Sequence, residues 1–315
     1  MKGKAETNER NRKAEVTWDT IEAVQGMQNY IREHALDETF CHKAVYDATG
    51  YSPRHCERIF KKLLHKTVSE YIKAIRLSQS ARQLVDVREE SVLDIALESG
   101  FASHEGYSRA FREEFGISPM AYRKDPIAIP LFTQYPVRDY YSHLFQKEKR
   151  KMNNDSAICM VTVVSRPKRM LLLLRSQKAH DYWSYCEEKG CDWEGLFNSI
   201  PERFDTAAIL QLPKFMVEKG TSHIASGVEL PADYKGKIPE ECDLIELEPC
   251  EMLYFQTQPF KEEDDYRNAI DSLHKAVECY EPRYYGYEYD TDKVPVFDFG
   301  ATPQMGARKA IPVKK

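Results

Sequence analysis

The clearest hydrophobic pattern in the chain lies between Ser91 and Arg123, where apolar residues recur with the 3.6-residue period of an α-helix. One apolar face ends at Gly100 and another begins after Ser103; Gly is typical of helix ends and Ser of helix starts. The pattern therefore predicts a helix, a tight turn and a second helix. The positions expected to face inward are Val92, Ile95, Ala96 and Leu97 on the first helix and Tyr107, Ala110, Phe111 and Phe115 on the second.

A similar unit lies earlier, between Val45 and Leu64. Its inward positions are Cys56, Ile59, Phe60 and Leu63, and its Ser52 and Arg58 fall into register with Ser103 and Arg109 of the later unit. The segment between the units, Val68 to Val85, predicts one helix of about 27 Å at 1.5 Å per residue. Two helix-turn-helix units can present helices to one face of DNA when they lie about one turn, roughly 34 Å, apart. Arg76 on the connecting helix lies among apolar residues, which favours a structural role for it.

The outer face of each second helix is polar and partly cationic, as expected of a helix that enters a major groove and contacts base edges. For an isolated helix, a solvated surface would be the better interpretation, and it is the repeat that favours DNA. We therefore expect double-stranded DNA as a partner. The predicted DNA contacts are Arg54, Glu57, Arg58, Lys61 and Lys62 on one helix and His104, Glu105, Ser108, Arg109 and Arg112 on the other.

Three segments in this region resemble the DNA-binding domain of AraC-family transcription regulators: GYSPRHCERIFKK, EYIKAIRLSQSARQL and VLDIALESGFASHEGYSRAFREEFGISPMAYR. The resemblance covers residues 15–125 and implies an all-α domain with two helix-turn-helix units, sequence-specific regulation of transcription, and RNA polymerase as a partner. One position departs from the family pattern. Tyr46 stands four residues before the turn glycine, where the family usually has a small residue, whereas the second unit keeps Ala96 there.

The segments on either side are polar or proline-rich. Residues 1–14 predict a disordered tail, and Asp19 to about His34 predicts a helix that packs on the first unit. Later helices have start signals at Ser52, Thr67, Ser91, Ser103 and Ser118. Residues 126–156 predict a linker, because three prolines prevent a helix in its first part and the polar run at 147–156 is expected to be flexible.

From Ala157 onward the chain has the pattern of an α+β domain, which we expect to cover residues 157–315. Helices are expected at Ala179–Ser199 and Glu262–Tyr280, and the pattern predicts a strand-helix-strand order twice, at 158–230 and 243–313. The expected strands are ICMVTVV, RMLLLLR, AAILQL, HIASGVEL, DLIEL and MLYFQTQ.

The segments IASGVEL, IELEPCEMLYFQTQPF, YGYEYD and AIPVKK resemble the GyrI-like effector-binding domain that follows the DNA-binding domain in many AraC-type regulators. The resemblance implies a pocket between two halves that takes up amphipathic and frequently cationic small molecules. Arg308 and Lys309 stand where that family usually has an acidic residue. The predicted ligand-binding residues are Trp183, Trp193, Phe197, Phe255, Tyr287 and Tyr289, with Glu229 and Glu288 as candidate carboxylates for a planar cationic ligand. For any one of these rings, burial in the core is the alternative.

Charge and cysteine content refine this picture. Residues 15–125 carry 15 Lys or Arg against 18 Asp or Glu, so phosphate contacts have to come from local clusters and helix N-termini. No apolar run reaches the length of a membrane span, and the first residues are polar, so we expect a cytoplasmic protein. Eight cysteines without a CxxC spacing predict reduced thiols, no structural metal and no cofactor.

An enzyme is the alternative to a ligand-responsive regulator, because some GyrI-like domains resemble small-molecule hydrolases that use a glutamate and a tyrosine. Glu288 with Tyr287 or Tyr289 are the candidates. Neighbouring residues on a strand point to opposite faces, so an adjacent pair could not share a site. The chain shows no Ser/His/Asp spacing, phosphate loop or metal cluster, and we expect a regulator rather than an enzyme.

Overall fold

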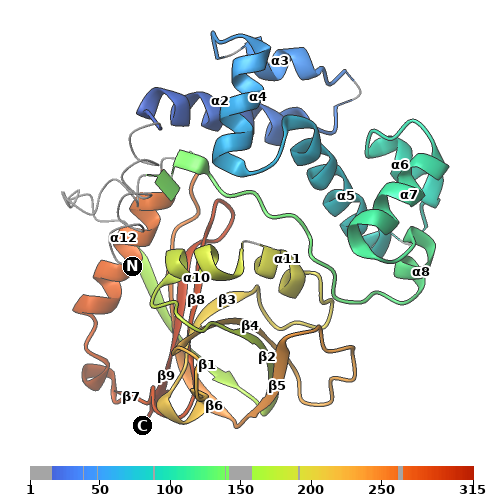
Figure 1. Cartoon of the computed structure of the whole chain (residues 1–315). Coiled ribbons are helices and arrows are strands. Elements are labelled where there is room, and N and C mark those ends of the chain that lie inside the picture. The colour runs from blue at the N-terminus through green and yellow to red at the C-terminus, as the bar shows by residue number, and fades with distance from the viewer. Residues whose placement is uncertain are drawn as a thin grey trace. The chain divides into compact units, whose positions relative to one another are not determined.

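The computed structural model describes residues 16–37, 39–47, 49–87, 89–138, 140–141, 158–190, 192–261 and 265–315. The predicted tail, 1–14, and residues 142–156 of the predicted linker lie outside these ranges. The chain forms two compact units (Figure 1). Among the described residues, unit 1 comprises 16–125 and 132–141, and unit 2 comprises 126–131 and 158–315. In the described parts of the chain, no helix is both long and apolar enough to span a bilayer.

Unit 1 is helical, and the helices after Ser52, Thr67, Ser91, Ser103 and Ser118 start where the sequence predicts, whereas α3 starts at His42 without a capping side chain among the described residues. The side chains of Thr17, Ser52, Thr67, Ser91, Ser103 and Ser118 each accept a hydrogen bond from a backbone N–H in the first turn of the helix that follows. The helices are α2 (Trp18–His34), α3 (His42–Asp47), α4 (Pro53–Leu64), α5 (Val68–Asp86), α6 (Val92–Glu98), α7 (His104–Phe115) and α8 (Pro119–Lys124).

The long helix α5 links two cores within unit 1. At its start, α2, α3 and α4 bury Ile21, Val45 and Phe60 against Tyr71. Toward its end, the rings of Tyr107, Phe111, Phe115 and Tyr122 pack edge to face or at a tilt. The inward positions predicted for α4 and α7 are all buried, as are Val92, Ile95 and Ala96 on α6.

Leu97 is an exception, because its predicted inward orientation is wrong and 52% of its surface is exposed. The helix α6 has only seven residues, and Ile95 and Ala96 already occupy its buried side. Each residue turns about 100° from the one before, which carries Leu97 out to solvent.

Residues 126–141, which the sequence assigns to the linker, carry specific hydrogen bonds within the two units. In unit 2, the Ile129 N–H donates to Ser199 Oγ at 2.9 Å. In unit 1, the Phe132 N–H donates to Ser78 Oγ at 2.7 Å, and the Val137 N–H donates to Gln28 Oε1 at 2.9 Å. Ile129 and Val137 are buried, so this segment is part of the packed structure of the units.

Unit 2 contains one antiparallel sheet of nine strands in the order β1-β6-β9-β8-β3-β4-β2-β5, with β7 paired to β9. Its strands are β1 (Cys159–Arg166), β2 (Arg169–Arg175), β3 (Ala208–Gln211), β4 (Ile224–Pro231), β5 (Cys242–Leu247), β6 (Cys250–Thr257), β7 (Glu288–Tyr289), β8 (Val296–Thr302) and β9 (Gly306–Lys314). Its helices are α10 (Tyr182–Lys189), α11 (Asp192–Asn198) and α12 (Asp265–Cys279), with 3-10 turns η2 (Lys214–Met216) and η3 (Pro282–Tyr285).

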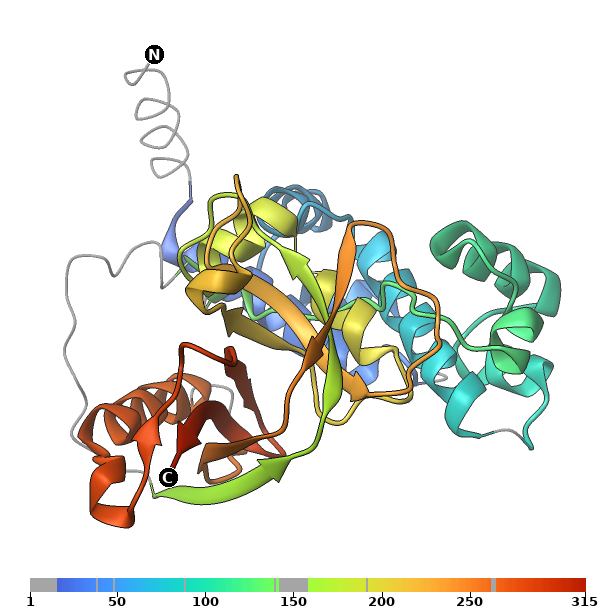
Figure 2. The ribbon, with the colours of Figure 1, turned by 90° about the horizontal axis from the view of Figure 1, so that it is seen from below.

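The sheet has two apolar faces. On the helix face, α10 and α11 pack over β2 and β4, and α12 packs over β6, β8 and β9 (Figures 1 and 2). The inner face is the opposite one, where Leu171, Leu210, Met252 and Phe297 form a separate core. The single helix predicted at 179–199 is two helices, because α10 ends at Gly190, whose φ of 79° favours glycine.

Candidate nucleic-acid interface and ligand-binding face

The second helix-turn-helix consists of α6, a turn at Gly100 and α7. Gly100 has a φ of 75°, and the N–H of the next residue, Phe101, donates to the Ala96 carbonyl at 3.0 Å, which closes the C-terminus of α6. Ser103 then caps α7 through the Gly106 N–H at 3.1 Å. The hydroxyl of Tyr107 donates to Ser80 Oγ on α5 at 3.1 Å in the buried core. These contacts fix α7 by its inner face and leave its outer face in solvent.

The first helix-turn-helix consists of α3, a turn at Gly50 and α4. Gly50 has a φ of 71°, and Ser52 and Pro53 start α4 as predicted. Tyr46, the residue that departs from the family pattern, is half-buried, and its hydroxyl donates to Glu57 Oε1 at 2.6 Å. Burial and this hydrogen bond both raise the pKa of Tyr46, so the phenol stays protonated. Tyr46 thereby joins α3 to α4 through a polar contact.

The predicted DNA contacts lie mainly on exposed surfaces of α4 and α7. Arg54, Arg58, Lys61 and Lys62 are exposed on α4, as are His104, Glu105, Arg109 and Arg112 on α7, and Ser108 is half-buried. Glu57 is different. One of its carboxylate oxygens accepts from Tyr46, and the other accepts from the Val68 N–H at 3.4 Å, so its carboxylate is engaged within the domain. Sequence periodicity placed Glu57 on the outer face but could not show these partners.

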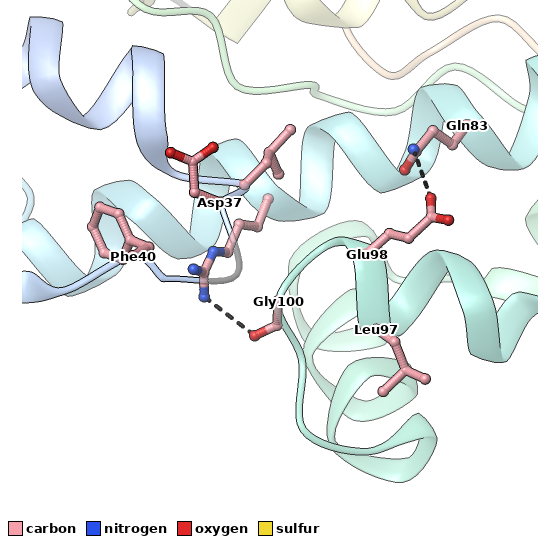
Figure 3. A pocket seen from close by; sticks show the side chains of 8 residues that line it. Asp37, Phe40, Gln83, Leu97, Glu98 and Gly100 are labelled. Carbon is pink, nitrogen blue, oxygen red and sulfur yellow. Dashed lines mark hydrogen bonds between the residues drawn. The ribbon is translucent and has the colours of Figure 1, made fainter.

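Arg76, in the middle of α5, connects the C-terminal end of α2 to the turn of the second helix-turn-helix. Its Nε donates to the Ala35 carbonyl at 2.8 Å. Its Nη1 donates to the Gly100 carbonyl at 3.2 Å, the bond that is dashed beside Gly100 in Figure 3. Its guanidinium also lies over the Phe40 ring, 5.4 Å from the centroid. A Cβ at Gly100 would lie 2.7 Å from Arg76 Cζ, so a larger residue here would displace the guanidinium, and the φ of 75° favours glycine as well. The structural role predicted for Arg76 is therefore confirmed.

A groove of about 660 Å³ lies beside this contact, within unit 1 (Figure 3). On one side Gln83 Nε2 donates to Glu98 Oε2 at 3.5 Å. The groove is lined by Leu36, Asp37, Phe40, Arg76, Gln83, Leu97, Glu98 and Gly100. The lining residues come from the segment between α2 and α3, from α5 and from the second helix-turn-helix.

The geometry can now be compared with known proteins. A family profile described as a helix-turn-helix domain matches residues 45–125. The regulatory protein SoxS of Salmonella typhimurium is 35% identical over 100 residues, which make up 32% of this chain and 92% of SoxS. This chain belongs to the AraC family of transcription regulators. It is a DNA-binding regulator of the AraC type.

Two further matches of this AraC-type regulator cover a similar share of the chain. The right origin-binding protein of Escherichia coli K12 is 37% identical over 94 residues, which are 30% of this chain and 32% of that protein. The crystal structure of a transcriptional regulator with an AraC-type DNA-binding domain from Chromobacterium violaceum is 27% identical, with a TM-score of 0.30. The match covers 33% of this chain and 95% of the Chromobacterium violaceum chain.

The ligand-binding residues predicted in unit 2 are not brought together. Trp193 and Phe197 are buried on the helix face under α11, and Phe255 is buried on the same face under α12. Tyr287 packs at the edge of the α12 core, and Trp183 is half-buried on α10. Trp193, Phe197, Phe255 and Tyr287 therefore belong to the helix cores.

The two predicted carboxylates, Glu229 and Glu288, differ in burial. Glu229 on β4 is buried on the inner face, where it is bonded to Arg169. Glu288 and Tyr289 form the short strand β7 and are both exposed, with Glu288 3.8 Å from Lys314 Nζ. The contacts of the described residues thus give Glu288 no buried site in which it could act as a hydrolase residue with Tyr287 or Tyr289.

Sequence analysis missed an arginine cluster on the inner face, formed by Arg166, Arg169 and Arg308 with Glu229 and Asp205. Arg166 Nε is 3.3 Å from Glu229 Oε2 and its Nη2 is 3.7 Å from Asp205 Oδ2. On the other side of the same carboxylate, Arg308 Nη1 donates to Asp205 Oδ1 at 2.8 Å. The departure at Arg308 was the available signal, but its partner Asp205 is 103 residues away along the chain.

Proposed function

We propose that one copy of this regulator binds double-stranded DNA with α4 and α7 in successive major grooves on one side of the duplex. The observation that supports this most directly is the pair of exposed, cation-bearing helices held at the two ends of α5. The 19 residues of α5 span about 28 Å at 1.5 Å per residue. This length suits the roughly 34 Å between successive grooves, and two recognition helices in one chain require no palindrome.

The proposed contacts divide by chemistry. Arg58 and Arg109 occupy equivalent exposed positions and are proposed to contact a base edge or a nearby phosphate. Exposed cations on α4 outnumber those on α7, so α4 is proposed to supply more of the phosphate contacts. Glu57 is proposed to orient α4 through Tyr46 instead of contacting DNA. The other proposed contacts are Arg54, Lys61, Lys62, His104, Glu105, Ser108 and Arg112.

Substitution of the two equivalent arginines tests this proposal on a site selected from genomic DNA. Arg58→Ala and Arg109→Ala should each weaken binding to that site by about 1 to 3 kcal/mol in a mobility-shift titration at fixed salt. Arg32→Ala is the matched control, since Arg32 is an exposed arginine on α2, outside the recognition helices. Parental affinity in both recognition-helix variants would refute the placement of α4 and α7.

We further propose that unit 2 binds a small-molecule effector that changes how the DNA-bound chain acts on transcription, with RNA polymerase as the partner. Both halves of unit 2 place helices between two pairs of strands, α10 and α11 in the first half and α12 in the second. This recurring order and the charged cluster on the inner face support a ligand-binding role. The sequence suggested a planar cation. Glu229 is already paired with arginine and Glu288 with Lys314, so neither carboxylate supports that preference.

The effector role is tested with the full-length chain. Compounds that are planar and anionic, neutral or cationic can be screened by thermal unfolding, because a ligand that binds only the folded state raises Tm. Each compound that raises Tm is then added to an operator titration. The proposal requires at least one compound that does both, and a screen in which stabilising compounds never change operator affinity would refute it.

A further inference from the structure

The arginine cluster has more positive than negative charge. Arginine is always protonated in proteins, so the cluster contains three guanidiniums against the two carboxylates of Glu229 and Asp205. The side chains are 0% exposed for Arg169, 2% for Glu229, 6% for Arg308 and 14% for Arg166. A surplus charge held among buried groups is costly unless it is paired, so this cluster has a place for one more anionic group.

Neighbouring groups do not supply the missing charge. Burial, followed by the nearby Glu229, raises the pKa of Tyr254 to about 12, so this phenol beside Arg166 is neutral. Burial also raises the pKa of the Cys250 thiol, which contacts Arg169. Among the described residues, the other nearby cations form ion pairs of their own, Lys168 with Glu246 and Lys309 with Asp298.

Arg166 has the hydrogen-bond donors that an anion would need. Its Nη2 donates to the Tyr254 hydroxyl, while its buried Nε lies 3.3 Å from Glu229 without the alignment of a hydrogen bond. Its Nη1 donates to no group in the part of the chain that the structure describes. Arg169, in contrast, donates hydrogen bonds to Glu229, to the Pro167 and Glu248 carbonyls and to Cys250. The surplus charge therefore belongs to Arg166 and its neighbour across Asp205, Arg308.

Aromatic rings lie beside both guanidiniums. Arg166 lies over Tyr254, 5.2 Å from the ring centroid, and Arg308 lies over Phe299 at 4.7 Å. The two rings are stacked on each other with centroids 6.0 Å apart and an angle of 24° between their planes. Ring faces attract cations but do not carry a countercharge. Tyr254 and Phe299 are each partly exposed, so they offer a flat apolar surface next to the charged groups.

We propose that Arg166 and Arg308 are the anion-binding part of a ligand site on the inner face of unit 2, and that this site takes a planar organic carboxylate. The carboxylate pairs with the guanidiniums, and the flat apolar body of the ligand lies against Tyr254 and Phe299. A guanidinium can hold a carboxylate through two parallel N–H donors, which gives the pairing direction as well as charge. This assignment rests on the proposed effector role of unit 2 and gives that effector its chemical class.

Calorimetry on the full-length chain with three matched probes tests the charge preference without any substitution. The probes are 2-naphthoate, the neutral 2-naphthamide and the cationic 2-naphthylmethylammonium, which share one ring system. The carboxylate should bind at least about tenfold more tightly than either of the others, because a charged hydrogen bond is replaced by a neutral one or by repulsion. Equal binding of the three probes, tighter binding of the cation, or no binding of the carboxylate at millimolar concentration would overturn the proposal.

Substitutions then locate the site. Arg166→Met should remove the preference for the carboxylate over the amide, and Arg166→Lys should keep part of it. Arg175→Met is the matched control: Arg175 is a buried arginine on β2, but it pairs with both Glu218 and Asp243 and so has no surplus charge. A preference that survives Arg166→Met, or is lost equally in Arg175→Met, would place the anion elsewhere.

The Arg166 side-chain resonance provides a readout that does not depend on variant stability. The ¹⁵N-¹H signal of its Nε should shift on addition of 2-naphthoate and stay in place with the amide. Binding of the carboxylate at Arg166 with no change in operator affinity would leave the anion site standing while contradicting the effector role. A change in operator affinity caused only by neutral or cationic compounds would support the effector role and refute the anion site.

Discussion

At the scale of single residues, Tyr46 shows how one side chain changes the joint between two helices. A small residue at this position would allow α3 and α4 to cross closely. Tyr46 instead extends its hydroxyl to Glu57, whose second oxygen accepts from the first turn of α5 at Val68. A side chain predicted from its periodicity to contact DNA thus connects three helices. The sequence shows that Tyr46 departs from the family pattern, but only the structure shows that Glu57 accepts its hydrogen bond.

Removal of this hydroxyl should destabilise the domain without changing its packing. Tyr46→Phe should lower the free energy of unfolding by about 1 kcal/mol, because Glu57 loses a partially buried hydrogen-bond donor. Urea denaturation of the full-length chain measures the change. Tyr51→Phe is the control, since Tyr51 is an exposed ring tilted against His55, and among the described residues no hydrogen bond involves its hydroxyl. Equal effects of the two substitutions would contradict the role assigned to Tyr46.

At the scale of elements, the sequence predicts unit 1 closely because every one of its described helices except α3 carries its own start signal. A serine or threonine cap followed by an apolar period fixes both the start and the buried face of a helix. The buried face of a short helix is harder to predict, as Leu97 on α6 shows, because seven residues of apolar pattern do not define one face. The break between α10 and α11 depends on Gly190, and an isolated glycine in a helical pattern does not reveal whether the chain bends there.

The contact of Arg76 with the Ala35 and Gly100 carbonyls predicts an effect on the spacing between α4 and α7. Arg76→Met should lower affinity for the selected site by about tenfold, since two hydrogen bonds from a charged group are lost. Affinity for sites with one or two base pairs inserted or deleted between the two contacted segments should fall much less. A set of such DNA sites, titrated by mobility shift, measures this spacing preference.

Lys73→Met is the control for charge on the same helix, because Lys73 only forms an exposed pair with Glu113 at 3.6 Å. It should leave the spacing preference of the parent unchanged. If Arg76→Met weakens binding to every spacing by the same factor, Arg76 contributes to stability alone and does not set the distance between the recognition helices.

At the scale of the whole molecule, the sequence separates the helical unit from the sheet unit but does not locate the functional face of the sheet. Both faces of this sheet are apolar, one against helices and one in the inner core, so strand alternation cannot tell which residues meet a ligand. Large aromatic size alone predicts Trp193, Phe197 and Phe255 as ligand contacts, but these rings lie under helices. The arginine cluster depends on partners distant along the chain, which no local pattern reveals.

The central claim is that one chain carries both recognition helices needed for its site. Hydroxyl-radical footprinting of the selected DNA, combined with a titration that counts chains per duplex, tests it most directly. The account predicts one chain per site and two protected segments about 10 base pairs apart on the same side of the duplex. Two chains bound to an inverted repeat, or a single protected segment that is unchanged by Arg58→Ala, would contradict it.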